Sequence, residues 1–319
     1  MATVKPLDLA DRLSPDAPAR PVLLDGGTAT ELEQDGHDLS DALWSARLLL
    51  DAPEAVAAVH RRFLAAGAEV VTTASYQLAA ASLSAAGRDP GQADALLARS
   101  VTVARDAVDA ALAAGCTTRD GRRPLVAASV GPYGAVLADG SEYRGGYGLS
   151  EDELVRFHAP RVAALVAAGA DALAVETVPS AVELAALARV LAGVPVPVYA
   201  SVTLSDDGQA TAEGQPLAAA FAPLLALDEV VAVGVNCCPP PLVLPALRAL
   251  AGCGRPLVAK PNVGRRWDAT TRRWVDGDDG GPADDGRDGE RVRDAAFDLD
   301  TLISAHNPGQ TVVLDQACE

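Results

Sequence analysis

Aromatic residues make up only 4% of this 319-residue chain, so a packed core has to be built mainly from Ala, Val and Leu. The apolar share of 49% is large enough for such a core, which excludes a disordered or fibrous protein. Basic residues are few, with 26 Lys and Arg against 43 Asp and Glu, and the formal net charge is −17. A surface this acidic repels nucleic-acid backbones and anionic lipids, so we expect neither as a partner.

Long apolar runs and a disulfide pattern are also missing. No apolar run reaches the roughly 18 residues of a membrane span, and the first residues lack the basic and apolar regions of a secretory signal. The five cysteines are odd in number, and two of them, Cys237 and Cys238, are adjacent. This arrangement argues against a disulfide framework and favours thiolate or metal chemistry. We therefore expect a protein of the reducing cytoplasm.

Short β-branched and apolar runs alternate with Ala-rich segments of helical periodicity. Apolar strands separated by helices are typical of a parallel sheet that is buried on both faces. Eight such units predict a single α/β domain over residues 1–319, folded as a (β/α)8 TIM-type barrel, with an open doubly wound sheet as the alternative. Because the sequence stops soon after the eighth strand, we expect the barrel to lack its final helix. The expected strands lie at residues 22–24, 70–73, 125–129, 172–176, 196–203, 230–236, 257–260 and 311–314.

Two segments interrupt this alternation. Residues 131–149 form a Gly- and Tyr-rich stretch after the third strand, and residues 264–290 form a divergent Asp/Gly-rich stretch after the seventh. The aspartates of the second stretch do not have the spacing of an EF-hand, since no Glu closes the loop. We therefore expect a solvated, mobile loop there. Ser150 and Glu153 fit a capping box that opens the helix after the first stretch.

Polar residues collect where the expected strands end, which in a TIM-type barrel is the rim that carries the active site. Asp25 follows the first strand, Glu176 ends the fourth, and Asn236 and Cys237 end the sixth. Asp25 also suits a simple turn, and adjacent cysteines alternate faces, so at most one of them faces the mouth. An ionised Glu176 after an apolar run needs a cation or hydrogen-bond donors. These residues alone predict a soluble barrel enzyme with two carboxylates and a thiol-rich rim, but they name no reaction.

Several long motifs resemble those of the homocysteine S-methyltransferases, a zinc-dependent family that uses S-methylmethionine or a related methyl donor. The motifs span roughly residues 20–275 and read LLDGGTATELE, GAEVVTTASYQ, SVGPYGAVLADGSEYRGGYGLS, AVETVPS, VVAVGVNC and KPNVG followed by WD. The third motif resembles the S-methylmethionine branch of the family more than the betaine branch. The resemblance implies a barrel enzyme that transfers a methyl group to the small-molecule substrate homocysteine and forms methionine.

The same resemblance implies roles for the rim residues. In the family, zinc held by three cysteine sulfurs makes the homocysteine thiol a thiolate, which attacks the methyl group of a sulfonium donor. Asp25 and Glu176 match the residues that hold the ammonium group of homocysteine, and Cys237 matches the first zinc ligand. Aromatic faces and a carboxylate suit a sulfonium cation, although a Gly/Tyr-rich segment can equally be a lid. The candidates for the pocket of the methyl donor are Tyr76, Tyr133, Glu142 and Tyr143, and Asn236 is a further substrate-binding candidate.

The C-terminal region departs from the family pattern. The family takes its other two zinc ligands from a Gly-Gly-Cys-Cys motif after the eighth strand, whereas this sequence reads TVVLDQACE. Cys318 is the remaining candidate for a second metal ligand, with Asp315 as an oxygen ligand. Lys260 and Arg265 also stand where the family more often has a tyrosine and a glutamate, and Lys260 adds a positive charge near the mouth.

Two alternatives to an active methyltransferase remain open. The first is a non-catalytic or impaired family member that binds an amino acid or a partner, because the Cys-Cys pair is missing. The second is an unrelated barrel lyase that uses Asp25 and Glu176 as acid and base, which leaves the Gly/Tyr-rich segment unexplained. The sequence leaves open the methyl donor, S-methylmethionine or S-adenosylmethionine, and the oligomeric state.

Overall fold

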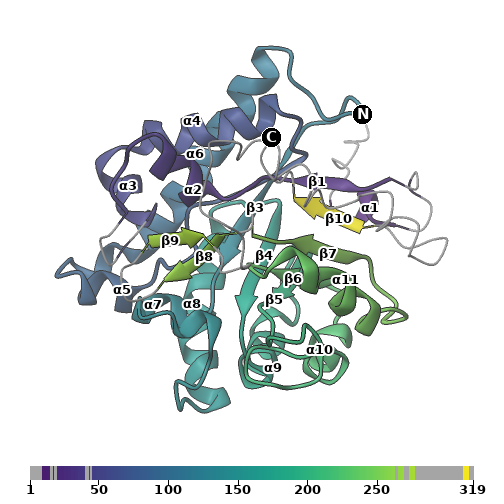
Figure 1. Ribbon diagram of the computed structural model, residues 1–319. Helices are drawn as coiled ribbons and strands as arrows, with labels where there is room; N and C mark the ends of the chain where they lie inside the picture. The colour runs from purple at the N-terminus through teal and green to yellow at the C-terminus, as the bar shows by residue number, and fades with distance from the viewer. Residues whose placement is uncertain are drawn as a thin grey trace.

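The computed structural model describes residues 9–14, 17, 20–39, 43, 45–262, 265–268, 273–276 and 312–315. Its main element is a closed barrel of parallel strands: β1 (Val22–Leu24), β2 (Val70–Thr72), β3 (Leu125–Val130), β4 (Ala172–Val178), β5 (Val198–Val202), β6 (Val230–Asn236), β7 (Leu257–Lys260) and β10 (Val312–Asp315). Their order around the barrel is β1-β10-β7-β6-β5-β4-β3-β2, and Figure 1 shows yellow β10 between purple β1 and green β7. The predicted TIM-type barrel is therefore confirmed, and the open sheet is excluded.

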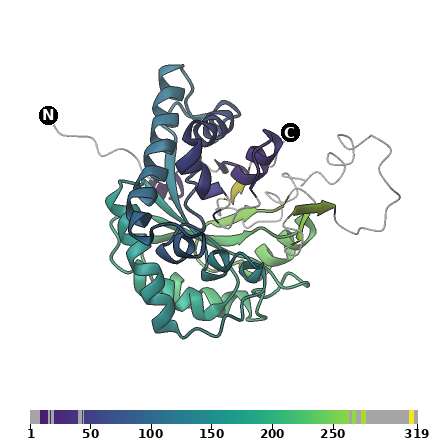
Figure 2. The same ribbon diagram turned by 90° about the vertical axis from the view of Figure 1, so that its left-hand side faces the viewer.

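Helices connect the strands and form a layer around them, as the turned view in Figure 2 shows. No described helix has the length and apolar character needed to cross a bilayer. The predicted capping box is present, since the Ser150 N–H donates to Glu153 Oε2 at 2.8 Å and the Glu153 N–H donates to Ser150 Oγ at 3.4 Å. The helices are α1 (Leu9–Arg12), α2 (Thr28–Gln34), α3 (Ser45–Asp51), α4 (Pro53–Ala65), α5 (Ala80–Ala85), η1 (Pro90–Gln92), α6 (Ala93–Ala113), α7 (Tyr133–Leu137), η2 (Ser141–Tyr143), α8 (Glu151–Ala167), α9 (Ala181–Leu191), α10 (Leu217–Leu225) and α11 (Pro240–Ala249).

Small apolar side chains fill the barrel, as the shortage of aromatic residues predicts. Strands β3 and β4 are buried along their whole length, and alternate residues face the barrel interior and the surrounding helices. The interior is lined by alanine, valine and leucine together with one aromatic side chain, Tyr199. Because two residues of the N-terminal segment, Leu9 and Leu13, belong to the same interior cluster, α1 covers the amino end of the barrel.

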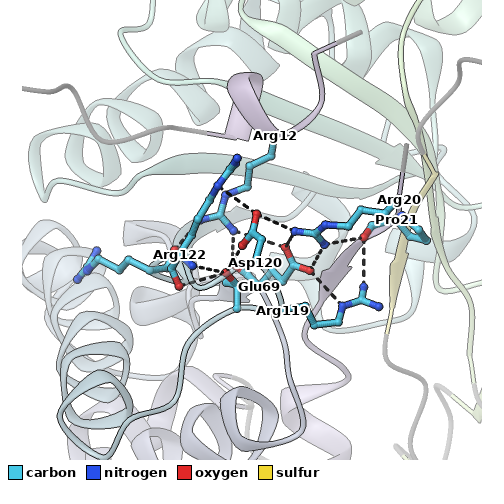
Figure 3. A network of polar contacts seen from close by, with 9 residues as sticks. Arg12, Arg20, Pro21, Glu69, Arg119, Asp120 and Arg122 are labelled. Atoms are coloured by element: carbon cyan, nitrogen blue, oxygen red, sulfur yellow. Dashed lines mark hydrogen bonds and ion pairs between the residues drawn. The ribbon is translucent and has the colours of Figure 1, made fainter. Parts of the chain in front are cut away.

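A network of arginines and carboxylates closes this amino end, as Figure 3 shows. Its centre is Glu69, which is fully buried just before β2. Arg20 donates to Glu69 Oε1 at 2.5 Å, and Arg12 and Arg119 lie 3.7 and 3.5 Å from the same carboxylate. Arg20 also pairs with Asp120 at 2.9 Å. A buried carboxylate needs such partners, so the network fixes the N-terminal segment to the bottom of the barrel, opposite the rim.

The prediction of a solvated loop over residues 264–290 is wrong at its start. Strands β8 (Arg265–Asp268) and β9 (Arg273–Asp276) form an antiparallel hairpin in which Trp267 is paired with Trp274. The segment is rich in Asp and Gly overall, but it contains two short runs, RRWD and RWVD, whose Trp and Val residues favour paired strands. The rest of this segment and residues 316–319 lie outside the described residues, so the absence of a final helix stays a prediction.

His60 makes the stability of the fold depend on pH. This α4 side chain is fully buried without a hydrogen-bond partner in the described part of the chain, and burial lowers its pKa to about 4. The unfolded chain has the higher pKa and binds more protons, so stability is retained above about pH 6.5 and lost as the pH falls toward 4. We expect a loss of about 2 kcal/mol between about pH 7 and pH 5 from this group. Urea unfolding of wild type and His60→Leu over this pH range measures this loss. If the free energy of unfolding of the two proteins depends on pH in the same way, His60 is not the cause.

Candidate active site

The two predicted carboxylates lie at the carboxyl end of the barrel. Asp25 directly follows β1, and the Thr72 N–H and Thr72 Oγ1 donate to its two oxygens at 2.6 and 2.8 Å. Asp25 has no exposed surface, and this burial raises its pKa against the opposing effects of Lys260 and Thr72. Glu176 belongs to β4, and Ser129 Oγ of β3 donates to its Oε1 at 2.5 Å. Both carboxylates are thus oriented by hydroxyl groups of neighbouring strands.

Lys260, the last residue of β7, reaches across the mouth to these carboxylates. Its Nζ lies 3.6 Å from Asp25 Oδ1 and 3.7 Å from Glu176 Oε2. The side chain of Lys260 is mostly buried, at 13% exposure. Tyr199 of β5 lies close to the same charges, and its pKa is raised by burial and then by Glu176. The positive charge that the sequence places near the mouth therefore lies between the two predicted ammonium ligands.

The ends of β4 and β6 share an unusual backbone conformation. Thr177 and Cys237 adopt positive φ angles of 61° and 50°, and the register of β4 against β5 shifts beside Thr177. Asn236 connects the two ends, since its Oδ1 accepts from the Thr177 N–H and its Nδ2 donates to Thr177 Oγ1, both at 2.8 Å. Left-handed conformations of non-glycine residues concentrate at functional sites, because surrounding contacts have to hold them.

Cys237 presents its sulfur at this corner of the rim. Asn236 Nδ2 and Thr177 Oγ1 donate to Cys237 Sγ at 3.3 and 3.5 Å. Cys238 is buried in the core instead, and burial raises its pKa to about 12. Only one of the adjacent cysteines is thus available at the rim, as their alternation predicts. No cluster of three metal-binding side chains occurs among the described residues, and Cys318 lies outside them.

Three of the predicted donor-pocket residues lie together near Cys237. Burial raises the pKa of Tyr76 and of Tyr143 well above its usual value, and the nearby Glu142 and Cys237 add to this effect. Glu142 has its pKa raised to about 7, chiefly by burial. Its buried Oε2 has no hydrogen-bond partner in the described structure. Two tyrosines and a buried carboxyl group with an unpartnered oxygen therefore lie near the candidate metal ligand.

Close backbone approaches explain the glycines of this segment. A Cβ atom on Gly134 would lie 2.4 Å from the Glu142 N, and one on Gly131 would lie 2.5 Å from the Tyr76 O. A side chain at Gly134 would displace η2, which carries Glu142 and Tyr143. The spacing of glycines in the motif therefore fixes the backbone that carries Tyr76 and Glu142.

Tyr133 is the fourth residue predicted for the methyl-donor pocket, but its ring packs against other aromatic residues of the Gly/Tyr-rich segment and of α8. Its ring centroid lies 5.5 Å from that of Tyr147 and 5.1 Å from that of Phe157. Its backbone N–H donates to Glu183 Oε1 at 2.6 Å. These contacts make Tyr133 an anchor of the Gly/Tyr-rich segment on α8 and α9.

Glu183 is the centre of this anchor. It is fully buried in the first turn of α9, and it also accepts from Tyr147 Oη and His158 Nε2, both at 2.8 Å. Burial lowers the pKa of His158, so the neutral ring carries its proton on Nε2 when it donates to the carboxylate. Three donors from different parts of the chain therefore converge on one carboxylate.

Arg161 connects the loops that follow β2 and β3. Its guanidinium donates to the carbonyl oxygens of Leu78, Gly131 and Tyr76 at 2.9, 3.0 and 2.8 Å. Burial lowers its pKa to about 10. Arg161 thus fixes the backbone that carries Tyr76 relative to the Gly/Tyr-rich segment.

Sequence reasoning missed the side chains that support the site. A signal for two of them exists in the periodicity of α8, where Leu154, His158, Arg161 and Leu165 share the buried face. Polar residues in an apolar helical stripe need internal partners, which marks His158 and Arg161 as members of a network. Thr72, Ser129 and Thr177 carry no comparable signal, because each is an ordinary residue of a strand.

Comparison with known proteins agrees with this geometry. The sequence model of the family described as "Homocysteine S-methyltransferase" matches residues 22–295. The Escherichia coli homocysteine S-methyltransferase is 45% identical over 255 residues, and Bacillus subtilis homocysteine S-methyltransferase YbgG is 41% identical, each match covering 79% of this chain and 81% of the relative.

Solved structures give the same result. The oxidized form of the homocysteine methyltransferase MmuM from E. coli superimposes with a TM-score of 0.78 at 38% identity, covering 96% of this chain and 94% of that one. Its metallated form gives a TM-score of 0.73 at 38% identity, covering 92% and 91%. The chain belongs to the homocysteine S-methyltransferase family of enzymes.

Proposed function

We propose that this protein transfers a methyl group from S-methylmethionine, or from S-adenosylmethionine, to the thiol of L-homocysteine, which becomes methionine. One observation carries the proposal: Asp25, Glu176 and Cys237 lie on one rim of a barrel of this family. Two carboxylates for an ammonium group and a sulfur ligand for a metal are the parts that an amino-acid thiol requires.

The acceptor is oriented by its ammonium group and by its thiol. Its ammonium group pairs with Asp25 and Glu176, whose oxygens are held by Thr72 and Ser129. Its thiol then lies toward Cys237 at the β6 corner. The thiol releases its proton to solvent, its sulfur forms a bond to the donor methyl carbon, and the bond from that carbon to the sulfonium sulfur breaks with the electron pair staying on the donor sulfur. Holding both reactants in this geometry supplies much of the rate.

The residues at the rim fit a metal ion in part. Cys237 offers an oriented sulfur, and we assign the further ligands to Cys318 and to Asp315, the last residue of β10. Strand β10 pairs with β1 and β7, which places its carboxyl end on the same rim as Asp25 and Lys260. Zinc bound there would favour the thiolate form of the substrate thiol.

The donor pocket is formed by Tyr76, Glu142 and Tyr143. The unpartnered Glu142 Oε2 would be compensated by the positive charge of a sulfonium, and the tyrosine rings supply faces for cation–π contact. Because the donor is positive and the product thioether is neutral, this pocket binds the donor more strongly than the product. This difference in affinity favours replacement of the demethylated donor by a new sulfonium donor.

The experiment is an assay of the purified full chain for metal content and for methionine formation from homocysteine. We expect zinc in equimolar amount and faster turnover with S-methylmethionine than with S-adenosylmethionine. Metal far below equimolar together with no turnover would contradict the proposal. Homocysteine binding that a chelator leaves unchanged in calorimetry would then indicate the non-catalytic family member instead.

A further inference from the structure

The position of Lys260 relative to the two rim carboxylates suggests a role beyond charge balance. Its Nζ is almost equidistant from Asp25 Oδ1 and Glu176 Oε2, at 3.6 and 3.7 Å. Asp25 follows β1, Glu176 belongs to β4 and Lys260 ends β7, so three separate walls of the barrel converge on one ammonium group. An ammonium between two carboxylates is also the arrangement that the proposed function requires of the substrate.

The space between the two carboxylates is buried and is occupied by the ammonium group of Lys260. Asp25 has no exposed surface, the Glu176 side chain is 10% exposed, and Lys260 is 13% exposed. An ammonium group brought by a ligand therefore reaches Asp25 only after Lys260 Nζ moves aside. Removing Lys260 would leave two buried carboxylates facing each other across the mouth, which like charges oppose.

We propose that Lys260 is a tethered stand-in for the α-ammonium group of the acceptor. This inference rests on the proposed function and concerns its substrate class. Because the carboxylates are already paired, the site does not require an amino group on the ligand, and an amino acid has to displace Lys260 to bind. The acceptors then include ω-mercapto carboxylic acids without an α-amino group, alongside homocysteine. Lys260 is the residue that determines this tolerance.

Two thioethers test the inference without methyl transfer or metal activation. L-Methionine and 4-(methylthio)butanoate differ only in the α-amino group, and their dissociation constants are measured by calorimetry on the full chain. We expect wild type to bind them within about threefold of each other, and Lys260→Met to prefer methionine by about 100-fold, because the freed carboxylates then select an ammonium. Lys260→Arg is the matched control that keeps the charge, and it should behave as wild type.

The outcomes separate this inference from the proposed function. If methyl transfer to homocysteine is absent but Lys260→Met still changes the binding ratio, the proposed function fails, and what stands is that Lys260 occupies the ammonium position between the two carboxylates. If the protein turns over and the ratio is the same in wild type and both variants, the inference is overturned. A wild-type preference for methionine above about tenfold overturns it as well, even if Lys260→Met does not fold. The inference is also overturned if wild type binds neither of the two thioethers.

Discussion

Cys237→Ala should abolish most methyl transfer while leaving the barrel folded. The change removes the one described sulfur that Asn236 and Thr177 orient at the rim. A metal acting as a Lewis acid contributes several kcal/mol, so the rate should fall on the order of 1,000-fold together with the bound zinc. The measurements are metal content after gel filtration and the rate of methionine formation.

Cys238→Ala is the matched control, because it deletes the same atom one residue further along. Cys238 lies in the hydrophobic core and its pKa is raised by burial, so its sulfur takes no part at the rim. We expect full metal content and a loss of roughly 1 kcal/mol in stability from the small cavity. If Cys237→Ala keeps its zinc and its activity while Cys238→Ala loses them, the assignment of the metal ligand is wrong.

Glu183→Ala should give the largest loss of stability among single changes outside the rim. It leaves the Tyr133 N–H, the Tyr147 hydroxyl and His158 Nε2 without their shared acceptor, and of these donors His158 is fully buried and the two tyrosines are partly buried. Each unsatisfied buried donor costs about 1–3 kcal/mol, so the free energy of unfolding should fall by roughly 3–5 kcal/mol. Urea unfolding followed by far-UV circular dichroism measures the loss.

Glu151→Ala is the comparison for this prediction. Glu151 also lies in the first turn of its helix, but it pairs with Arg189 at the exposed surface. Exposed pairs contribute about 0–1 kcal/mol, so this variant should be close to wild type. The same variants also report on the donor pocket, since loosening the Gly/Tyr-rich segment should raise the KM for the donor only in Glu183→Ala. Equal stability of the two variants would show that Glu183 does not hold the segment.

The strands and the rim could be predicted from sequence because both depend on local order. The apolar run that ends at Glu176 and the run that ends at Asn236 are visible one residue at a time, and parallel strands place their ends on one rim. Asp25, Glu176 and Cys237 follow from that rule together with the family motifs. The boundaries of β1, β6 and β7 agree with the prediction residue for residue.

The interactions between distant side chains could not be predicted in the same way. The sequence shows that Lys260 adds a positive charge near the mouth. Because the lysine side chain is long enough to reach several strands of the barrel, the sequence does not show which carboxylates it contacts. The convergence on Glu183 depends on how α8, α9 and the segment before α8 pack together, which no spacing within one segment encodes. The overall Asp/Gly composition of residues 264–290 predicts a loop, and only the local repeat of tryptophan indicates the β8–β9 hairpin.

The pairing of β10 has a consequence for how this protein is made. This strand closes the barrel by inserting between β1, near the start of the described chain, and β7. During synthesis the ribosome releases every other barrel strand first, so β1 and β7 spend that interval with unpaired backbone edges. Such edges invite association with other chains, and contacts between distant parts of a sequence form slowly. The nascent protein is therefore most exposed to aggregation just before its last strand emerges, when chaperone protection matters most.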